Sequence, residues 1–317
     1  MIIICQKCRT RFHLDDDVTE KTAFVVRCTV CDHLFSAYKP KRVQEITFLN
    51  LDRARQDDAN HHVMSISNRK GGVAKTTTCL NLGLSLSLHN KKVLLIDFDA
   101  QANLTLSMGH KQLPTFYDAQ KAIDRPLSDF IVESKYPNLW LLPSGRNMVL
   151  LNKIYFGAQH FEYMLKDRLN TVKDQFDFIL IDTPPSIEYY TLNALTASNR
   201  VIIPCQCDYL STHGVDQVLR LISLIRKRSN PQIRSRILFT MLDRTNNSSQ
   251  LILSKIKDLY QGQTFKTAIE MDGELKEAQI LSMPAIHYSR NSVAGTQYLE
   301  LAKEIIQRLD DKQPAAP

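Results

Sequence analysis

The sequence predicts an α/β protein whose main domain is a doubly wound, mostly parallel sheet, preceded by a small β module. Three short apolar runs that end in polar or acidic residues are separated by helical patterns, and two C-x-x-C pairs stand near the N-terminus. Apolar runs that alternate with helical patterns are typical of parallel strands with helices on both faces. At 317 residues, the chain is long enough for one large domain and one small module.

The composition limits the classes of partner and compartment. Lys and Arg outnumber Asp and Glu by 40 to 33, which gives a net charge of +7 and a pI near 9.0. This surplus is compatible with a polyanionic partner and equally with an ordinary solvated surface. No apolar stretch approaches the roughly 18 residues that a membrane span requires. We therefore expect a cytoplasmic protein that makes no contact with a membrane.

Four of the seven cysteines form the two C-x-x-C pairs, which are Cys5/Cys8 and Cys28/Cys31. The pairs are separated by 19 residues, a spacing typical of four thiolates that bind one Zn²⁺. Residues 22–27 and 34–37 are expected to be two paired strands. A module of about 40 residues cannot build a sufficient core alone, so the metal would supply folding energy. Disulfides and redox dithiols are the alternatives, and a cytoplasmic chain without a thioredoxin-like context argues against both.

Residues 5–12 and 26–35 resemble a family of small zinc ribbons found at the N-termini of varied bacterial proteins. The resemblance implies a structural zinc site within residues 1–38. Residues 39–60 are charged and polar, and we expect them to form a linker. We hypothesise that the ribbon is an adaptor that docks a protein or nucleic-acid partner.

A phosphate-binding loop follows the first apolar run, residues 63–66. Leucines at helical spacing follow the loop. In such an arrangement, backbone N–H groups and the helix N-terminus bind the anion, a lysine neutralises its charge, and a hydroxyl holds Mg²⁺. The residues that we expect to contact the nucleotide are Lys70, Gly71, Gly72, Val73, Ala74, Lys75, Thr76 and Thr77.

The loop departs from the usual pattern G-x-x-x-x-G-K-[ST], because Arg69 and Ala74 occupy both glycine positions. It also contains a second lysine, Lys70, five residues before Lys75. A single nucleotide bound to a single subunit does not require two lysines in the loop. This oddity predicts a protein that works as a dimer.

Carboxylates follow the other two apolar runs. Asp97 and Asp99 come after residues 93–96, and Asp182 comes after residues 178–181. Because the carboxyl ends of parallel strands meet at one edge of the sheet, we expect these side chains to lie beside the phosphate loop. Thr76 is then predicted to bind Mg²⁺ directly, and Asp182 and Asp97 to hold the water molecules of the ion.

The remaining catalytic roles follow from the chemistry of phosphoryl transfer. Lys75 is predicted to stabilise charge on the β- and γ-phosphates, and Asp99 to orient the attacking water. The chain has no Asn-Lys-x-Asp motif for guanine, since its two Asn-Lys pairs continue as Lys92-Val93 and as Ile154-Tyr155. ATP is therefore the expected nucleotide.

Several of these motifs resemble the ParA/Soj partition ATPases of the ParA/MinD superfamily. The residues that carry the resemblance are 70–77, 97–101, 182–186, 191–197, 203–208 and 241–246. The match runs from about Val63 to Leu309. It implies a P-loop NTPase fold with a deviant Walker A loop, over residues 61–310. Residues 311–317 are expected to be a flexible tail.

The resemblance also implies a working cycle. Lys70 is the signature lysine that reaches across an ATP-sandwich dimer, and Asp99 is needed for hydrolysis. Members of the family form homodimers with ATP, and a ParB-like protein or cargo adaptor stimulates their slow, Mg²⁺-dependent hydrolysis. The cycle positions plasmids, chromosomes or large protein assemblies.

One departure from the family concerns DNA. Chromosomal members commonly carry a basic segment that contributes to non-specific DNA binding. In the aligned stretch, residues 269–278, Met271 and Glu274 replace both basic positions, so DNA phosphates would be repelled there. A second basic cluster (Arg226, Lys227, Arg228, Arg234 and Arg236) leaves non-specific DNA binding and association with the nucleoid open, with solvated helix-end cations as the alternative.

The leading hypothesis is thus a dimerising ATPase that positions or segregates a cargo and uses its ribbon as an adaptor. The alternative is a DNA-binding regulator in which the ribbon recognises nucleic acid and ATP only licenses dimerisation. A metabolic ATPase of the nitrogenase iron-protein type would need cluster-binding cysteines in the ATPase domain. Cys205 and Cys207 have the wrong spacing for that role.

Overall fold

A computed structural model describes residues 2–5, 7–8, 10–13, 23–38, 62–208 and 211–310 of the chain. The chain divides into two compact units, residues 1–57 and residues 58–317. The expected linker at residues 39–60 and the expected tail at residues 311–317 lie outside the described residues.

The N-terminal unit contains two pairs of antiparallel strands. Strand β1 (Ile2–Ile4) pairs with β2 (Arg11–His13), and β3 (Ala23–Arg27) pairs with β4 (Leu34–Tyr38). The expected pairing of residues 22–27 with residues 34–37 is confirmed to within one residue at each end. Among the described residues, the buried core of this unit consists of Cys5, Cys28 and Phe35.

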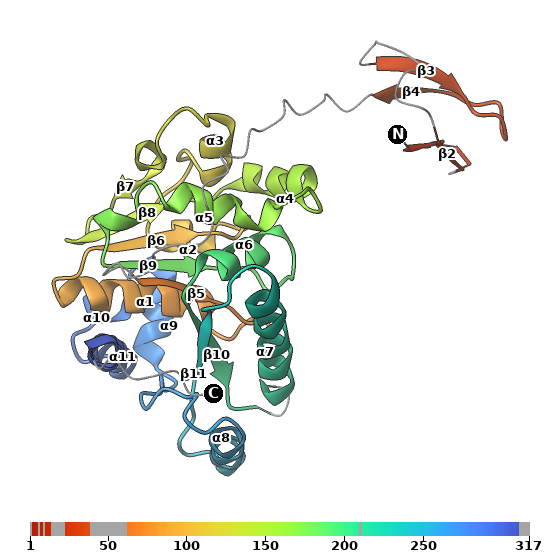
Figure 1. The fold of residues 1–317 in the computed structure, drawn as a ribbon. Coiled ribbons are helices and arrows are strands. Elements are labelled where there is room, and N and C mark those ends of the chain that lie inside the picture. Colours follow the sequence, from red (N-terminus) through yellow and green to blue (C-terminus); the bar gives the residue numbers. More distant parts are fainter. Residues whose placement is uncertain are drawn as a thin grey trace. The chain divides into compact units, whose positions relative to one another are not determined.

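The C-terminal unit is built on a mostly parallel sheet (Figure 1). Its strands lie in the order β11-β10-β5-β9-β6-β8-β7, and each neighbouring pair is parallel except β7 and β8. The strands are β5 (His62–Ile66), β6 (Val93–Asp97), β7 (Val132–Glu133), β8 (Leu139–Leu142), β9 (Phe178–Asp182), β10 (Arg200–Gln206) and β11 (Arg234–Thr240). The predicted doubly wound α/β fold is therefore confirmed.

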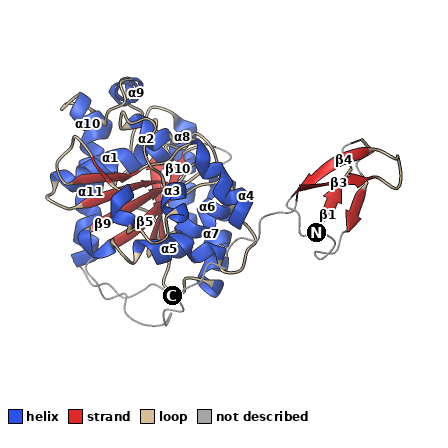
Figure 2. Cartoon of the chain, turned by 90° about the horizontal axis from the view of Figure 1, so that it is seen from above, coloured by secondary structure: helices blue, strands red, loops and turns tan. Residues whose placement is uncertain are grey.

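Helices cover both faces of this sheet (Figure 2). They are α1 (Lys75–Leu88), α2 (Asn103–Ser107), α3 (Phe116–Lys121), α4 (Val149–Tyr155), α5 (Met164–Leu169), α6 (Tyr189–Ala197), α7 (Ser211–Arg228), α8 (Asn247–Leu259), α9 (Gly273–Ile280), α10 (Ala285–Tyr288) and α11 (Val293–Asp310). Short 3₁₀ turns lie at Leu127–Phe130, Arg146–Met148, Phe161–Tyr163 and Lys173–Gln175. None of the helices in the described part of the chain has both the length and the apolar character of a membrane span.

Alternate residues of the central strands point to opposite faces, as the period of a strand requires. Val93 and Leu95 of β6 pack in a cluster with residues of α1 and α11, whereas Leu94 and Ile96 pack in a second cluster with residues of α3, α5 and α6. Both faces are thus apolar, which explains why β6 reads as an uninterrupted apolar run.

Helix α1 is buried for most of its length, because it lies on the sheet and under α11. Gly83 allows its close approach to the sheet: a Cβ atom there would lie 2.5 Å from Cδ2 of Leu95. The hydroxyls of Thr78 and Tyr298 share a buried hydrogen bond of 3.1 Å between α1 and α11. The packing of α1 therefore fixes the position of the loop that precedes it.

Candidate nucleotide and metal sites

The phosphate loop is pinned at its start by Asn68. This buried side chain donates from Nδ2 to the carbonyl of Pro204 at 2.6 Å, and its Oδ1 accepts from the N–H of Lys70 at 3.0 Å. Gly72 and Ala74 have φ values of 73° and 66°, in the left-handed region. An alanine in this conformation costs roughly 1–2 kcal/mol. The loop therefore keeps a glycine-like backbone at Ala74 even though the glycine is absent.

Lys75 is the first residue of α1, and its side chain turns back onto the loop. Its Nζ donates to the carbonyl of Lys70 at 3.0 Å, and the residue is only 8% exposed. Burial lowers the pKa of Lys75, and the carboxylates of Asp182 and Asp99 raise it in opposition. An ammonium group held in this way is placed to contact a phosphate that enters the loop.

Asp182 lies at the end of β9 and faces the first turn of α1. Its Oδ2 accepts from the hydroxyl of Thr76 at 2.6 Å, while its Oδ1 is buried without a hydrogen-bond partner. Burial, followed by the repulsion of Asp97, raises the pKa of Asp182 well above its usual range. A buried carboxylate oxygen without a partner, next to a hydroxyl, fits the ligand set of hydrated Mg²⁺. Bound there, the ion would neutralise charge on the phosphates.

Asp97 is the register partner of Asp182, at the end of the adjacent strand β6. Its Oδ2 accepts from both the N–H and the hydroxyl of Thr105, each at 2.7 Å, and its Oδ1 accepts from the N–H of Asp99 at 3.3 Å. Burial raises the pKa of Asp97 to about 6. Unlike Asp182, Asp97 is held by the protein through both of its oxygens.

Asp99 is partly exposed at the same edge of the sheet, two residues beyond Asp97. Its Oδ1 accepts from the N–H of Gln101 at 2.9 Å. The second loop lysine, Lys70, forms an ion pair with Asp208, just beyond the end of β10. Both side chains of this pair are partly exposed at the rim of the loop.

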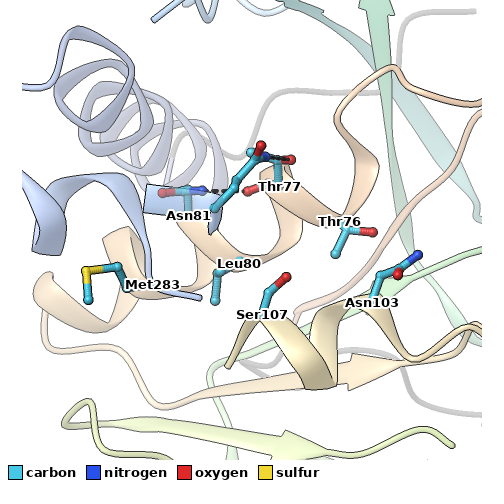
Figure 3. Close-up of a pocket in the computed structure, with 8 residues that line it drawn as sticks. Thr76, Thr77, Leu80, Asn81, Asn103, Ser107 and Met283 are labelled. Carbon is cyan, nitrogen blue, oxygen red and sulfur yellow. Dashed lines mark hydrogen bonds between the residues drawn. The ribbon is translucent and has the colours of Figure 1, made fainter. Parts of the chain in front are cut away.

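A cavity of about 220 Å³ lies beside the first turn of α1. Figure 3 shows Asn103 and Ser107 of α2 on one side and Thr76, Thr77 and Leu80 of α1 on the other. None of the lining residues carries a charge; the others are Asn81, Gln279 and Met283. The side chain of Gln279 donates to the hydroxyl of Thr77 at 2.6 Å, so α9 is tied to the helix that carries the loop.

The four N-terminal cysteines converge as expected. Their Sγ atoms all lie within 4.8 Å of one another; two of the separations are 3.6 Å for Cys5 and Cys31 and 3.5 Å for Cys8 and Cys28. Four sulfurs about 2.3 Å from one ion stand nearly this far apart at the corners of a tetrahedron, so the residues fit Zn²⁺. The hydroxyl of Thr10, 3.1 Å from Cys8, lowers the pKa of that thiol to about 6.

The second basic cluster is partly structural. The guanidinium group of Arg226 donates to the carbonyl of Ile233, and that of Arg236 donates to the carbonyls of Gly262 and Thr264. Lys227, Arg228 and Arg234 are exposed.

A half-buried arginine adds to this cluster. Arg200 is the register partner of Arg234. Burial lowers the pKa of Arg200, and the positive charges of Arg234 and Arg236 lower it further. Within residues 269–278, Glu270 forms an ion pair with Arg244 at 2.5 Å. Positive charge is therefore concentrated at the edge of the sheet where β10 and β11 begin, opposite the edge that carries the phosphate loop.

Sequence reasoning missed four residues that shape the site: Asn68, Thr105, Ser144 and Asp208. Each is a single polar residue whose partner is distant in the sequence, apart from Thr105, which lies eight residues from Asp97. Only the spacing of Asp97 and Thr105 offered a local pattern that could have been noticed.

The loop, its buried lysine and the Thr76–Asp182 pair at the carboxyl edge of a parallel sheet define a P-loop nucleoside triphosphatase. An AAA domain family model matches residues 61–235, and a zinc-ribbon domain model matches residues 1–36. Sporulation initiation inhibitor protein Soj of Bacillus subtilis is 34% identical over 250 residues, covering 77% of this chain and 97% of Soj. Chromosome partitioning protein ParA of Myxococcus xanthus is 32% identical, covering 80% of this chain and 90% of ParA.

The chain therefore belongs to the ParA/Soj family of ATPases, and it carries a zinc ribbon at its N-terminus. Its cofactors are ATP, Mg²⁺ and Zn²⁺. Among solved structures, cobyrinic acid a,c-diamide synthase from Mycobacterium smegmatis with bound ADP and magnesium superposes with a TM-score of 0.69 at 29% identity, over 81% of this chain and 100% of its own. An ATP complex of a Cyanothece McdA variant shares the fold, with a TM-score of 0.70 at 21% identity over 81% and 100% of the two chains.

Proposed function

We propose that this protein is an ATPase that dimerises on binding ATP and so positions or segregates a cargo, with the zinc ribbon as its adaptor. The cargo is a plasmid, a chromosome or a protein assembly. The relatives named for chromosome partitioning support the class of function. The proposed organisation is a ribbon at residues 1–38, a linker at residues 39–60 and an ATPase domain at residues 61–310.

The observation that carries the proposal is the different placement of the two loop lysines. Lys75 lies inside the loop, whereas Lys70 stands at its rim and pairs with Asp208 of its own chain. In the single protomer, Asp208 is thus the partner of Lys70. In the proposed dimer, a phosphate of the nucleotide bound to the opposing subunit would take the place of Asp208. Nucleotide then shifts the population toward the dimer by as much as it binds the dimer better than the monomer.

The proposed roles at the site follow the geometry. Lys75 stabilises charge on the β- and γ-phosphates, Thr76 and Asp182 hold Mg²⁺, and Asp97 acts with them through water. Asp99 is partly exposed at the edge of the sheet, where its carboxylate can orient an attacking water. A ParB-like protein or cargo adaptor accelerates this step, and the ribbon supplies one contact to such partners. We place the whole cycle in the cytoplasm.

Three variants test this assignment in the intact protein. Lys75→Ala is expected to abolish ATP binding, Lys70→Ala to spare binding but weaken dimerisation, and Asp99→Ala to accumulate an ATP-bound dimer. Lys153→Ala, an exposed lysine of α4, is the matched control. Nucleotide titration, sedimentation and phosphate release measure the three properties. An Asp99→Ala protein that hydrolyses ATP at the wild-type rate would refute the assignment.

The proposal assigns DNA a reduced role. The Arg244–Glu270 ion pair and the exposed Met271 argue against the DNA contact that is usual in the family. If DNA is bound, the exposed side chains of Lys227, Arg228 and Arg234 are the remaining candidates. A salt-dependent shift of the ATP-bound protein onto random DNA, lost in Lys227→Ala/Arg228→Ala, would support non-specific DNA binding through this cluster, and no shift at low salt would exclude it.

A further inference from the structure

A buried chain of hydrogen bonds runs from the loop after β8 to the carboxylate of Asp97. The N–H of Ser144 donates to the hydroxyl of Thr105 at 2.9 Å, and that hydroxyl lies 2.7 Å from Oδ2 of Asp97. A hydroxyl carries one proton, and the amide of Ser144 is already a donor. Thr105 must therefore accept from Ser144 and donate to Asp97, so the direction of the chain is fixed.

A second contact joins the same two segments. The hydroxyl of Ser144 donates to the backbone carbonyl of Asp99 at 2.5 Å. Thr105 is 2% exposed and Ser144 is 5% exposed, so water does not compete for either bond. The turn from Asp97 to Asp99 is consequently held at two points, one on a carboxylate and one on the backbone.

The two contacts act on different groups of the catalytic edge. Thr105 touches Asp97, and both its backbone N–H and its hydroxyl bind the same oxygen, Oδ2. Ser144 binds the backbone carbonyl of Asp99, and its link to the carboxylate of Asp97 runs through the hydroxyl of Thr105. On the other side of α2, Asn103 and Ser107 line the cavity beside Thr76 (Figure 3). Helix α2 thus joins the surroundings of Thr76 to Asp97.

We infer that Thr105 and Ser144 are positioning residues for ATP hydrolysis. Thr105 orients the carboxylate of Asp97 toward the water shell of Mg²⁺, and Ser144 fixes the backbone from which Asp99 projects. This inference rests on the proposed roles of Asp97 and Asp99. The two residues differ in the property that each affects. Thr105 governs the affinity for Mg²⁺, and Ser144 governs turnover once Mg²⁺ is bound.

The test compares Thr105→Val, Thr105→Ser and Ser144→Ala with wild type. Valine keeps the shape of threonine but removes the hydroxyl, and serine restores the hydroxyl. Ser198→Ala is the control, because Ser198 is a buried serine whose hydroxyl donates to the backbone carbonyl of Ala194, away from the site. Fluorescent ADP titrated at increasing Mg²⁺ gives the Mg²⁺ midpoint without any hydrolysis, and phosphate release at saturating Mg²⁺ gives kcat.

Thr105→Val is expected to raise the Mg²⁺ midpoint about tenfold, as substitutions behind a metal ligand commonly do, and Thr105→Ser to return it to within about twofold of wild type. Ser144→Ala is expected to leave the midpoint within about twofold and to lower kcat about tenfold. Changes no larger than those of Ser198→Ala would overturn the inference, as would a Thr105→Ser variant as impaired as Thr105→Val.

The proposed function can be refuted independently of the inference about Thr105. Wild-type protein that binds ADP with Mg²⁺ but releases no phosphate from ATP would refute the ATPase cycle. In that case the Mg²⁺ midpoints of the two Thr105 variants still decide whether this residue orients Asp97.

Discussion

Among the described residues, the ribbon has a much smaller buried core than the ATPase unit (residues 58–317). Its buried residues Cys5, Cys28 and Phe35 include two of the four metal-binding thiols. In the ATPase unit, three apolar clusters line the two faces of the sheet among the described residues. We therefore expect the ribbon to depend on its ion to fold and the ATPase unit to fold without one.

In the ATPase unit, the two carboxylates at the ends of β6 and β9 are energetically unfavourable without a cation. Asp97 and Asp182 are buried side by side, and burial raises the pKa of both carboxyls. Bringing two carboxylates together in a dry site is unfavourable until a cation joins them. We therefore expect zinc to be needed for the ribbon to fold, and Mg²⁺ to relieve the repulsion between two buried carboxylates in a unit that folds without it.

The largest expected effect comes from removing zinc. A chelator, or Cys28→Ser, should unfold the ribbon completely, because structural zinc contributes about 10–16 kcal/mol to such small modules. The thermal transition and ATP turnover of the ATPase unit should not change. Zinc content, limited proteolysis and calorimetry on the full chain measure this, with Cys207→Ala as the control that keeps its zinc. A ribbon that resists protease without zinc would contradict the comparison.

A smaller effect is expected from neutralising Asp182. The folded-state pKa values of Asp97 and Asp182 lie above those of the unfolded chain, so both groups stabilise the Mg²⁺-free protein at low pH. Each contribution is lost as pH rises through the folded-state pKa of its group, which is about 6 for Asp97. Asp182→Asn should stabilise the Mg²⁺-free protein at pH 7.5 by about 1–3 kcal/mol and weaken the fall in its stability as pH rises.

Urea unfolding at several pH values measures the change, and ATP turnover should fall in the same variant. Asp97→Asn is the contrasting variant. An asparagine cannot accept all three hydrogen bonds that Asp97 receives, so it should destabilise the protein. Equal effects from the two substitutions would show that burial of charge is not the cost at this site.

Crowding the central helix should have a somewhat smaller effect. Gly83→Ala places a methyl group against Leu95 and is expected to destabilise the ATPase unit by about 1–2 kcal/mol, while zinc in the ribbon is retained. The matched control is Gly273→Ala, at a position where an added Cβ meets no atom within 4 Å. Thermal unfolding of the full chain separates the two, and identical transitions would show that α1 can move away from the sheet.

The smallest effect is expected at the contact between α1 and α11. Tyr298→Phe removes the buried hydrogen bond to Thr78 and should lower the free energy of unfolding by about 1 kcal/mol. Tyr117→Phe, on the partly exposed helix α3, should have no measurable effect. A loss above about 3 kcal/mol would mean that this hydroxyl organises more of the core than its one bond indicates.

The sequence was sufficient to predict the fold class and the position of the loop between β5 and α1. Apolar runs that end in Asp97 and Asp182 mark buried parallel strands, and the loop is contiguous, so its pattern is visible without a structure. The strand order was not predictable in this way, because it depends on contacts between distant segments. Nor was β7, whose two residues are too few to show any period.

The support around the site was equally hidden. Asp208 pairs with Lys70, 138 positions away in the sequence, and Ser144 binds Thr105, 39 positions away. No local sequence pattern predicts either contact. Charge patterning also gave an incomplete picture of Arg226. In the sequence it belongs to a run of surface cations, but in the fold its guanidinium group closes the turn before β11.

The crowding of Arg200, Arg234 and Arg236 has a consequence for the solutions in which the protein is handled. The pKa of Arg200 is lowered by its burial and then by the repulsion of the two neighbouring cations. Dissolved ions screen such repulsion, with a Debye length of about 10 Å at 0.1 M ionic strength and about 30 Å at 0.01 M. We therefore expect this edge to lower the stability of the ATPase unit in dilute buffer and to lower it less at physiological ionic strength. Dialysis into low-salt buffer is then the step at which repulsion at the start of β10 and β11 should be largest.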